Sequence, residues 1–512
     1  MRIVWLLAAV GLLGCRPDFD VVIEGGQVVD GTGAPAFEGD VGVRDGRIAQ
    51  IGDLSTFEAA HRIDAFGLVV SPGFVDVHSH AAPGLETSEL AAAVPLLAQG
   101  ITTIMANPDG GGAVDLEAQR ARLEAVTPGV HVGLLVPHGS VRREVMGMED
   151  RHATPEELIA MRALVQAGKE AGAFGLSSGL FYTPGSFAAL SEVIELATVF
   201  GADGVYASHI RDESNYSIGL EAAVDEVIQV ARGAGTTGIV THLKALGPPV
   251  WGYSERVIDR IEAARADGVD IWADQYPYEA SATGLTALVS RPLLAGGRDS
   301  LLSRLDWMSL LMRYDIEGNL ARRGGAERIQ FRRFVPDPSI EGRTLADVAR
   351  ERGVDAIEAT MQLLRQGNAG IVSFNMTDAD VERFMKRPWV MTSSDGGLVA
   401  MGEGVPHPRN YGSFPRKLSL YVRERGVLTL EQAVRSMSGL PAEVMKLRGR
   451  GTIAQGNWAD IVVFDAATIT DKATFTDPHQ LSVGVQYVLL EGRLALADGE
   501  VTADRLGRVL RR

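Results

Sequence analysis

Cysteine and positive charge are both scarce in this chain. Cys15 is the only cysteine among 512 residues, which excludes an intrachain disulfide, and its place near the N-terminus argues against thiol catalysis. Lysine and arginine together number 49 against 65 acidic residues, giving a formal net charge of −16, and no basic run offsets this excess. A nucleic-acid partner is therefore not expected.

Long apolar runs are also lacking, apart from one near the start. "MRIVWLLAAVGLLG" has a charged start, an apolar core and a small final residue, and it is too short to predict a membrane span. "LLGC" resembles a bacterial lipobox, so residues 1–14 are predicted to be a lipoprotein-type signal peptide and Cys15 a lipid anchor. The protein would then be exported and membrane-anchored at the cell envelope, on its periplasmic or extracellular face. A plain signal peptide or an apolar N-terminal strand is the alternative.

The two ends of the chain have the texture of short β-strands. Residues 15–70 contain alternating runs separated by Gly and Asp-Gly turns, as in "GDVGVRDGRIAQIG". Residues 441–512 repeat this pattern in "GNWADIVVFD" and "VQYVLLEGRLALADGE". We expect both ends to form one small β-sandwich domain, with a larger body inserted between them.

That body, residues 71–440, alternates apolar runs with helix-like stretches. The eight runs are "GFVDVH", "ITTIMA", "VHVGLLV", "AFGLSS", "GVYASH", "TGIVTH", "VDIWAD" and "PWVMTSSD". The helix-like stretches include 155–172, 188–200, 218–234 and 254–267. This alternation predicts an α/β fold, a TIM-like (β/α)8 barrel with its active site at the carboxyl ends of the strands. The rhythm breaks at about 283–370, where a helical insertion near the barrel mouth is expected.

Histidine and aspartate follow several of these runs. His78 and His80 come after the first, in an i, i+2 spacing that would put both side chains on one face of a strand. The fifth to eighth runs end at His209, His242, Asp274 and Asp395. A single histidine here would be an ordinary polar cap, but four histidines and an aspartate on one rim predict a metal site. The other histidines are interpreted as structural or peripheral: His61, His131, His138, His152, His407 and His479.

"PGFVDVHSH" with these downstream residues resembles the amidohydrolase superfamily, and within it the N-acyl-D-amino-acid deacylases (D-aminoacylases). The blocks "GLSSGLFYTPGSFA", "YASHIRDES", "DQYPYEASAT" and "SSDG…HPRNYGSFPR" occur in that family's order, and the likeness covers the mature chain. The resemblance implies metal-dependent hydrolysis of N-acyl-D-amino acids, releasing a carboxylic acid and a D-amino acid. One or two Zn²⁺ ions are implied, with Mn²⁺ or Co²⁺ as alternatives. The sequence does not set the oligomeric state.

The resemblance also assigns roles to particular residues. His78 and His80 would bind one metal with Asp395, which would also be the general base, while His209 and His242 would bind the other, tighter metal. Arg409 would hold the substrate α-carboxylate, since a guanidinium binds a carboxylate bidentately. Four residues match positions that assist it: Lys244, Tyr182, Tyr276 and Ser281.

One position departs from the family pattern. D-aminoacylases have a cysteine metal ligand after the second strand, but this chain reads "GITTIMANPDGGG" there. An ungapped alignment brings Asp109 to the place of the cysteine, and aspartate oxygens can bind or bridge metals. The alternative is that "NPDGGG" is simply a turn.

Two other functions remain open from the sequence. A cyclic-amide hydrolase of the dihydroorotase or hydantoinase kind, or an isoaspartyl-type dipeptidase, often bridges two metals with a carboxylated lysine after the fourth strand. The segment "AFGLSSGLFY" has no lysine, which disfavours these enzymes. An inactive surface binding lipoprotein is the alternative from another class, and the retained histidines and Asp395 argue against it.

Overall fold

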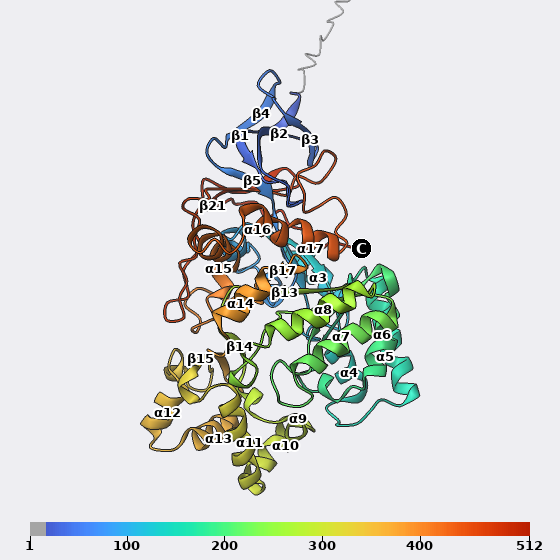
Figure 1. Ribbon diagram of the computed structural model, residues 1–512, viewed down its shortest axis with the longest axis vertical. Coiled ribbons are helices and arrows are strands. Elements are labelled where there is room, and N and C mark those ends of the chain that lie inside the picture. Colours follow the sequence, from blue (N-terminus) through green and yellow to red (C-terminus); the bar gives the residue numbers. More distant parts are fainter. Residues whose placement is uncertain (1–16) are drawn as a thin grey trace, which may run out of the picture.

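The computed structural model describes residues 17–512, and Figure 1 shows their arrangement. The predicted signal peptide and the lipid anchor at Cys15 lie outside the described residues. Within residues 17–512, no helix has the length and apolar character needed to cross a membrane.

The two ends of the chain share one nine-stranded sheet. The N-terminal strands are β1 (Phe19–Val28), β2 (Phe37–Arg44), β3 (Arg47–Gly52), β4 (Ala59–Asp64) and β5 (Val69–Pro72). The C-terminal strands are β18 (Ile461–Phe464), β19 (Val485–Leu490), β20 (Arg493–Ala497) and β21 (Glu500–Val501). β5 pairs antiparallel with β18, with Val70 opposite Val463, so residues almost 400 positions apart meet in one ladder. Val41, Val463 and Leu489 belong to the buried core of this region.

Each of the eight apolar runs of the central body contains a strand, and these strands pair in parallel. One sheet has three strands: β6 (Phe74–Asp76), β7 (Ile101–Ala106) and β8 (His131–Leu134). The other has six: β9 (Val136–Pro137), β10 (Gly175–Gly179), β11 (Val205–His209), β12 (Thr237–Val240), β13 (Ile271–Gln275) and β17 (Val390–Thr392). β8 and β9 belong to the same run and are separated only by Leu135.

The first and last of these strands are also joined just beyond their ends. The Asp395 amide donates to the His78 carbonyl over 2.9 Å, and the His80 amide donates to the Gly396 carbonyl over 2.8 Å. The sequence placed His78 within a strand, but β6 ends at Asp76, so both histidines lie in the loop after it. The i, i+2 argument therefore does not describe how their rings come together.

Helices cover the outside of the parallel strands (Figure 1). They are α3 (Leu116–Val126), α4 (His138–Met146), α5 (Pro155–Glu170), α6 (Leu190–Ala197), α7 (Leu220–Ala234), α8 (Ser254–Ala266) and α14 (Asp378–Met385). α5 shows how the sequence sets a helix start: Thr154 accepts from the Glu157 amide, Glu157 accepts from the Thr154 amide, and Pro155 occupies the first turn. Short helices complete the body: α1 (Ala82–Leu85), α2 (Val94–Leu97), α15 (Arg409–Arg416), α16 (Leu430–Met437) and α17 (Gly439–Val444).

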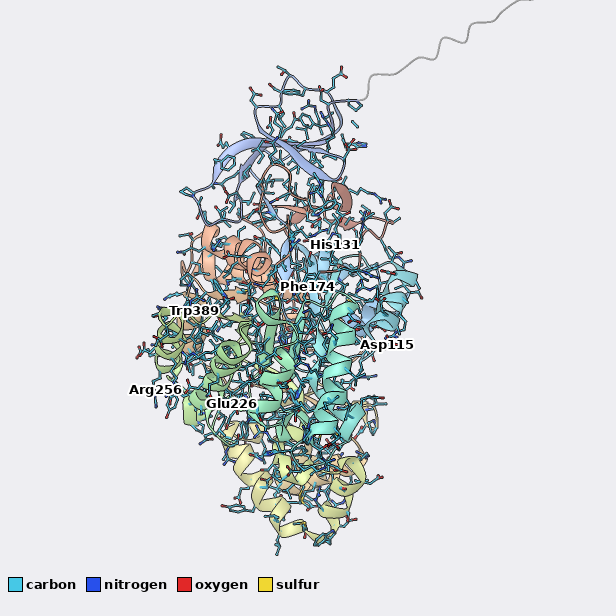
Figure 2. All side chains as sticks on the ribbon, turned by 90° about the vertical axis from the view of Figure 1, so that its right-hand side faces the viewer. Asp115, His131, Phe174, Glu226, Arg256 and Trp389 are labelled. Atoms are coloured by element: carbon cyan, nitrogen blue, oxygen red, sulfur yellow. The ribbon has the colours of Figure 1, made fainter. Side chains whose placement is uncertain are left out.

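His131, the first residue of β8, lies at the end of the parallel strands that faces the nine-stranded sheet (Figure 2). Its Nε2 is 3.4 Å from Asp460, just before β18, and its Nδ1 accepts from the Arg508 amide. This histidine is structural, as expected.

The insertion forms its own layer at the end of the molecule far from the N-terminal strands (Figure 1). It contains α9 (Arg291–Leu294), α10 (Gly297–Trp307), α11 (Ser309–Arg322), α12 (Leu345–Arg352) and α13 (Ala356–Gln366), with a separate buried core. It also has a three-stranded antiparallel sheet that the sequence analysis missed: β14 (Ser281–Gly284), β16 (Gly370–Ser373) and β15 (Ile329–Arg333). These strands are four or five residues long and far apart in sequence, so periodicity alone could not reveal their pairing.

Candidate metal centre

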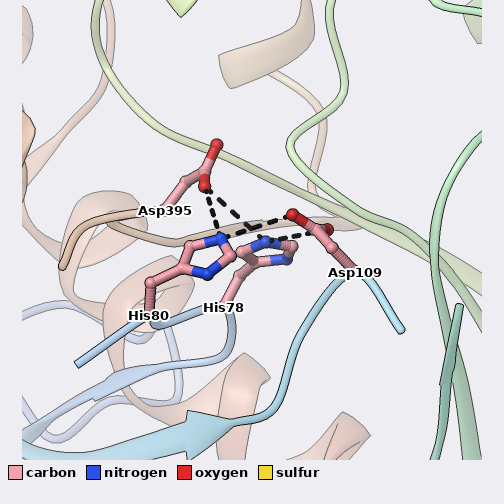
Figure 3. Close-up of side chains that lie close together, drawn as sticks. All are labelled: His78, His80, Asp109 and Asp395. Atoms are coloured by element: carbon pink, nitrogen blue, oxygen red, sulfur yellow. Dashed lines mark ion pairs between the residues drawn. The ribbon is translucent and has the colours of Figure 1, made fainter. Parts of the chain in front are cut away.

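Two histidines and two aspartates form a tight cluster at the carboxyl ends of β6, β7 and β17 (Figure 3). His78 Nε2 is 3.2 Å from Asp109 Oδ1 and 3.7 Å from Asp395 Oδ1. His80 Nε2 is 3.3 Å from Asp109 Oδ2 and 3.2 Å from Asp395 Oδ1. The two carboxylates thus face the same pair of imidazoles.

Asp109 also faces a second pair of imidazoles. Its Oδ1 is 3.7 Å from His209 Nδ1, at the end of β11, and 3.4 Å from His242 Nε2, just after β12. The ligand atoms of each group lie within 4.8 Å of one another, and Asp109 belongs to both groups. Its carboxylate is therefore placed to be shared between two cation sites.

The spacing of these side chains suits coordination of a shared metal ion better than direct hydrogen bonds between them. Two ligand atoms that each lie about 2.0–2.1 Å from a tetrahedral Zn²⁺ are about 3.3 Å apart, close to the separations in both groups. His78 Nε2, Asp109 Oδ1 and both ring nitrogens of His209 are buried and have no hydrogen-bond partner. Buried polar atoms are rarely left this way, and several together indicate an ion between them.

Strained backbone conformations place three of these side chains. Asp109, His242 and Asp395 have φ angles of 55°, 36° and 48°, a region that non-glycine residues seldom adopt and that costs about 1–3 kcal/mol each. The surrounding structure compensates: Asp274 accepts from the His242 amide over 2.9 Å and from Ser393 Oγ over 2.6 Å. Asp274, near the end of β13, therefore supports the backbone of the cluster through these hydrogen bonds and does not belong to the cluster.

The Asp109 loop is held by β10. Ser177 Oγ donates to the Asn107 carbonyl over 2.6 Å and accepts from the Gly110 amide over 3.2 Å. Gly110 has a φ of 67°, and a side chain there would lie 2.9 Å from the Gly179 amide nitrogen. The glycine after Asp109 thus lets the loop pack directly on β10.

Electrostatics favour charged carboxylates in the cluster. Burial works against ionisation of Asp109, but the nearby imidazoles of His78, His209 and His242 hold its pKa well below its usual value. Burial likewise disfavours ionised Asp395, yet Arg409 and His80 hold its pKa well below its usual value. For His80, the desolvation that lowers its pKa is outweighed by hydrogen bonds to the two aspartates, which raise it to about 9. Both carboxylates are thus kept as anions, the form that binds metal.

A cavity of about 640 Å³ opens onto this cluster. All five residues that the sequence assigned to the substrate line it: Arg409, Lys244, Tyr182, Tyr276 and Ser281. Arg409 NH1 is 2.7 Å from Asp395 Oδ2, and its guanidinium lies over the Tyr276 ring at 4.7 Å. Ser281 Oγ donates to Asn375, and Tyr182 OH is 3.3 Å from Thr283 Oγ1.

Glu213 is a site residue that the sequence analysis missed. Its Oε1 is 2.5 Å from Lys244 Nζ and 3.1 Å from His242 Nδ1, and its Oε2 is 3.8 Å from His209 Nε2. It therefore faces the sides of His242 and His209 that point away from Asp109, as carboxylates behind metal-bound histidines often do. The signal was its position four residues after His209 in "HIRDES".

His407 was interpreted as structural or peripheral; its contacts are structural, and it lies at the site rather than at the periphery. It is buried, lines the cavity, accepts from the Arg409 amide through Nδ1 over 3.0 Å, and lies 3.0 Å from the Ala280 carbonyl through Nε2. His407 thereby fixes the backbone at Arg409. His407 does not follow a predicted strand, so the search for histidines at strand ends did not identify it.

Comparison with known proteins agrees with this architecture. The model of the amidohydrolase family matches residues 62–301 and 311–495. The chain belongs to the amidohydrolase family. It is 38% identical to an N-acyl-D-glutamate deacylase from Alcaligenes xylosoxydans xylosoxydans over 96% of both chains.

Solved structures show that this chain resembles the D-aminoacylases more than it resembles the hydantoinases. A D-aminoacylase with a binuclear metal centre has a TM-score of 0.83 at 34% identity, covering 96% of this chain and all of that one. An N-acyl-D-glutamate deacylase from Bordetella bronchiseptica, in complex with zinc and a phosphonate inhibitor, has a TM-score of 0.81 at 36% identity over the same shares. An L-hydantoinase from Arthrobacter aurescens, with a TM-score of 0.58 at 17% identity, shares the fold alone. The resemblance to the D-aminoacylases is therefore confirmed.

Proposed function

We propose that this amidohydrolase hydrolyses the amide bond of N-acyl-D-amino acids and releases a carboxylic acid and a D-amino acid. The observation that carries the proposal is the placement of two imidazole pairs around Asp109, in a cavity that also contains Arg409. β10 has no lysine that could be carboxylated to bridge two metals, and the likeness to hydantoinases is distant. Both observations count against a cyclic-amide substrate. The complete ligand set counts against an inactive binding protein.

Two metal positions are proposed, consistent with the binuclear centre of the related D-aminoacylase. His78, His80 and Asp395 would hold one ion, His209 and His242 the other, and Asp109 would contribute to both. Bound Zn²⁺ supplies a Lewis acid that polarises the amide carbonyl and makes water more acidic. Asp109 brings a hard oxygen in place of the family's sulfur, so Mn²⁺ and Co²⁺ should also be accepted.

The protein's own residues then carry the proton and hold the substrate. Asp395 is anionic, so it can take a proton from the attacking water as the new carbon–oxygen bond forms. It returns that proton to the amine nitrogen as the carbon–nitrogen bond breaks. Arg409 would bind the α-carboxylate of the amino-acid half, and the fixed amide and carboxylate would leave one further contact to select the D-enantiomer.

The finer architecture belongs to the same proposal. The hydrogen bonds that join His78 to Asp395 and His80 to Gly396 support closure of the two parallel sheets into one (β/α)8 barrel, with the insertion at its mouth. The sheet shared by the chain ends would be the predicted β-sandwich domain. At the N-terminus, the lipobox-like "LLGC" supports export and anchoring at the cell envelope through Cys15.

Metal analysis combined with one set of assays tests the function. We expect the purified protein to contain zinc and to hydrolyse N-acetyl-D-amino acids but not their L-enantiomers or dihydrouracil. His209→Ala and His242→Ala should each lose the tighter metal and all measurable turnover. Full zinc content with near-native turnover in either variant would show that the site is misassigned.

A further inference from the structure

The segment between β18 and β19 leaves the nine-stranded sheet and reaches the wall of the metal cavity. Thr470 and Val483 pair through two backbone hydrogen bonds of 3.1 Å, which close the base of a loop formed by residues 471–482. This loop, the C-terminal loop, belongs to the end of the chain that shares its sheet with the N-terminal strands. It therefore connects that sheet with the candidate site.

Two elements beside the cavity are tied to the C-terminal loop. On the side of α15, His479 Nδ1 is 2.8 Å from Tyr411 OH, and Ser482 Oγ donates to the Tyr411 carbonyl over 2.7 Å. On the side of the insertion, Gln330 of β15 donates through Nε2 to the Phe475 carbonyl over 3.0 Å. Because the loop is held on both sides, its side chains can act as fixed supports for their neighbours.

The ring of Phe475 packs against His407. The two ring centroids are 4.9 Å apart at an interplanar angle of 76°, and the Phe374 ring lies 4.8 Å from Phe475. Edge-to-face contacts of this kind are favourable beyond the area that they bury. Phe475 is half-buried and is not among the residues that line the cavity, so it can act on a substrate only through the residues that it contacts.

His407 in turn contacts the backbone of two substrate-binding segments. Its Nδ1 accepts from the Arg409 amide over 3.0 Å, and its Nε2 donates over 3.0 Å to the carbonyl of Ala280, the residue before Ser281. One ring nitrogen accepts and the other donates, as in a neutral imidazole, and burial together with the charge of Arg409 holds the pKa of His407 well below its usual value. A shift of this ring would therefore move Arg409 and Ser281.

We propose that Phe475 is a positioning residue that acts through His407 to keep Arg409 aligned with the α-carboxylate of the substrate. This inference rests on the proposed deacylase function, and it gives the C-terminal part of the chain a role at the site. Loss of the ring would leave a cavity beside His407 into which the imidazole can move. A displacement of about 1 Å in a group that orients the substrate can lower the rate by about 100-fold.

A comparison of acid and ester substrates separates positioning from general stability. Phe475→Ala should raise KM for an N-acetyl-D-amino acid by about 10-fold, and leave kcat and the KM of the matching methyl ester within about 3-fold. Zinc content should equal that of the wild type, because the expected displacement is at the α-carboxylate. Phe475→Leu, which keeps much of the apolar volume, should restore KM in part.

Phe57→Ala is the matched control. Phe57 is also half-buried and packs edge-on against Phe19 of β1, with ring centroids 5.6 Å apart, in a cluster beside the nine-stranded sheet. This variant should lose stability to urea, as Phe475→Ala does, but keep both KM values.

A crystal structure of Phe475→Ala gives a readout that needs no turnover. We expect the His407 ring to shift and its hydrogen bond with the Arg409 amide to break. A retained hydrogen bond, or equal changes of KM for acid and ester, would overturn the inference and leave the deacylase function standing. A wild type that hydrolyses no N-acyl-D-amino acid would instead refute the proposed function, and the structure of the variant would still decide whether Phe475 holds His407.

Discussion

At the scale of single residues, Asp109 has the most distinctive position. Its Oδ1 is 3.2–3.7 Å from ring nitrogens of three histidines, and its Oδ2 is 3.3 Å from a fourth. We expect Asp109→Ala to lose metal affinity by more than the roughly 10–100-fold typical of a group behind the ligands, and to lose activity with it. Asp109→Cys should retain zinc and some turnover, with a sharper preference for zinc over Mn²⁺. Unchanged metal content in Asp109→Ala would leave a site made by the four histidines and Asp395 alone.

The contact between Arg409 and Asp395 changes the effect that we expect from removing Arg409. Because Arg409 NH1 is 2.7 Å from Asp395, Arg409→Met removes the partner of a buried carboxylate as well as a substrate contact. Turnover should therefore fall for every substrate. For free-carboxylate substrates, the loss of transition-state stabilisation should be about 2–5 kcal/mol larger than for the matching methyl esters, as measured by kcat/KM. Arg409→Lys serves as the control that keeps the charge. An identical loss on acids and esters would remove Arg409 from the α-carboxylate role.

At the scale of elements, the loop between β11 and α7 is organised by one buried carboxylate. Asp212 accepts from the backbone amides of Ser214, Tyr216, Ser217 and Gly219 at 2.5–3.1 Å. An amide cannot accept all four, so Asp212→Asn should destabilise the protein by about 2–4 kcal/mol and loosen Glu213 behind the histidines. Urea unfolding and zinc retention after mild chelation would measure the two effects. Asp203→Asn, at an exposed position, is the control, and stability equal to the wild type would show that the loop is held by packing instead.

At the scale of the whole molecule, one buried lysine should make stability depend on pH. Lys417 donates to Thr392 and Ser436 hydroxyls at 2.7 and 2.9 Å, and burial lowers its pKa to about 7 from 10.5. Between these values the unfolded chain binds more protons than the folded one, so Lys417 should make the free energy of unfolding rise with pH by about 1.4 kcal/mol per unit. Lys417→Met should remove that part of the slope between pH 7 and 10, whereas exposed Lys472→Met should not. Parallel slopes for all three proteins would show that Lys417 stays charged when folded.

The whole chain is also expected to be membrane-associated through its N-terminus. Cys15 follows an apolar segment that ends in a lipobox-like "LLGC", so lipidation should place the protein in the membrane fraction. Cys15→Ser should move it to the soluble fraction with unchanged deacylase activity, as measured by fractionation. A variant that still partitions with membranes would rule out lipidation as the anchor.

The sequence by itself determined the local features of this protein. Alternation of apolar runs and helix-like stretches located the parallel strands, which lie in the eight apolar runs, and helices such as α5 and α8, because burial periodicity and capping act over short segments. The positions of His78, His209, His242 and Asp395 after those strands followed from the same pattern, since parallel strands end on one edge of a sheet. Alignment with the family's motif brought Asp109 into consideration.

Only the tertiary structure decided which residues meet. The pairing of β5 with β18, the small sheet of the insertion, and the contacts of Glu213 and His407 depend on residues from distant segments. Such features arise from packing between elements, which a one-dimensional pattern does not encode.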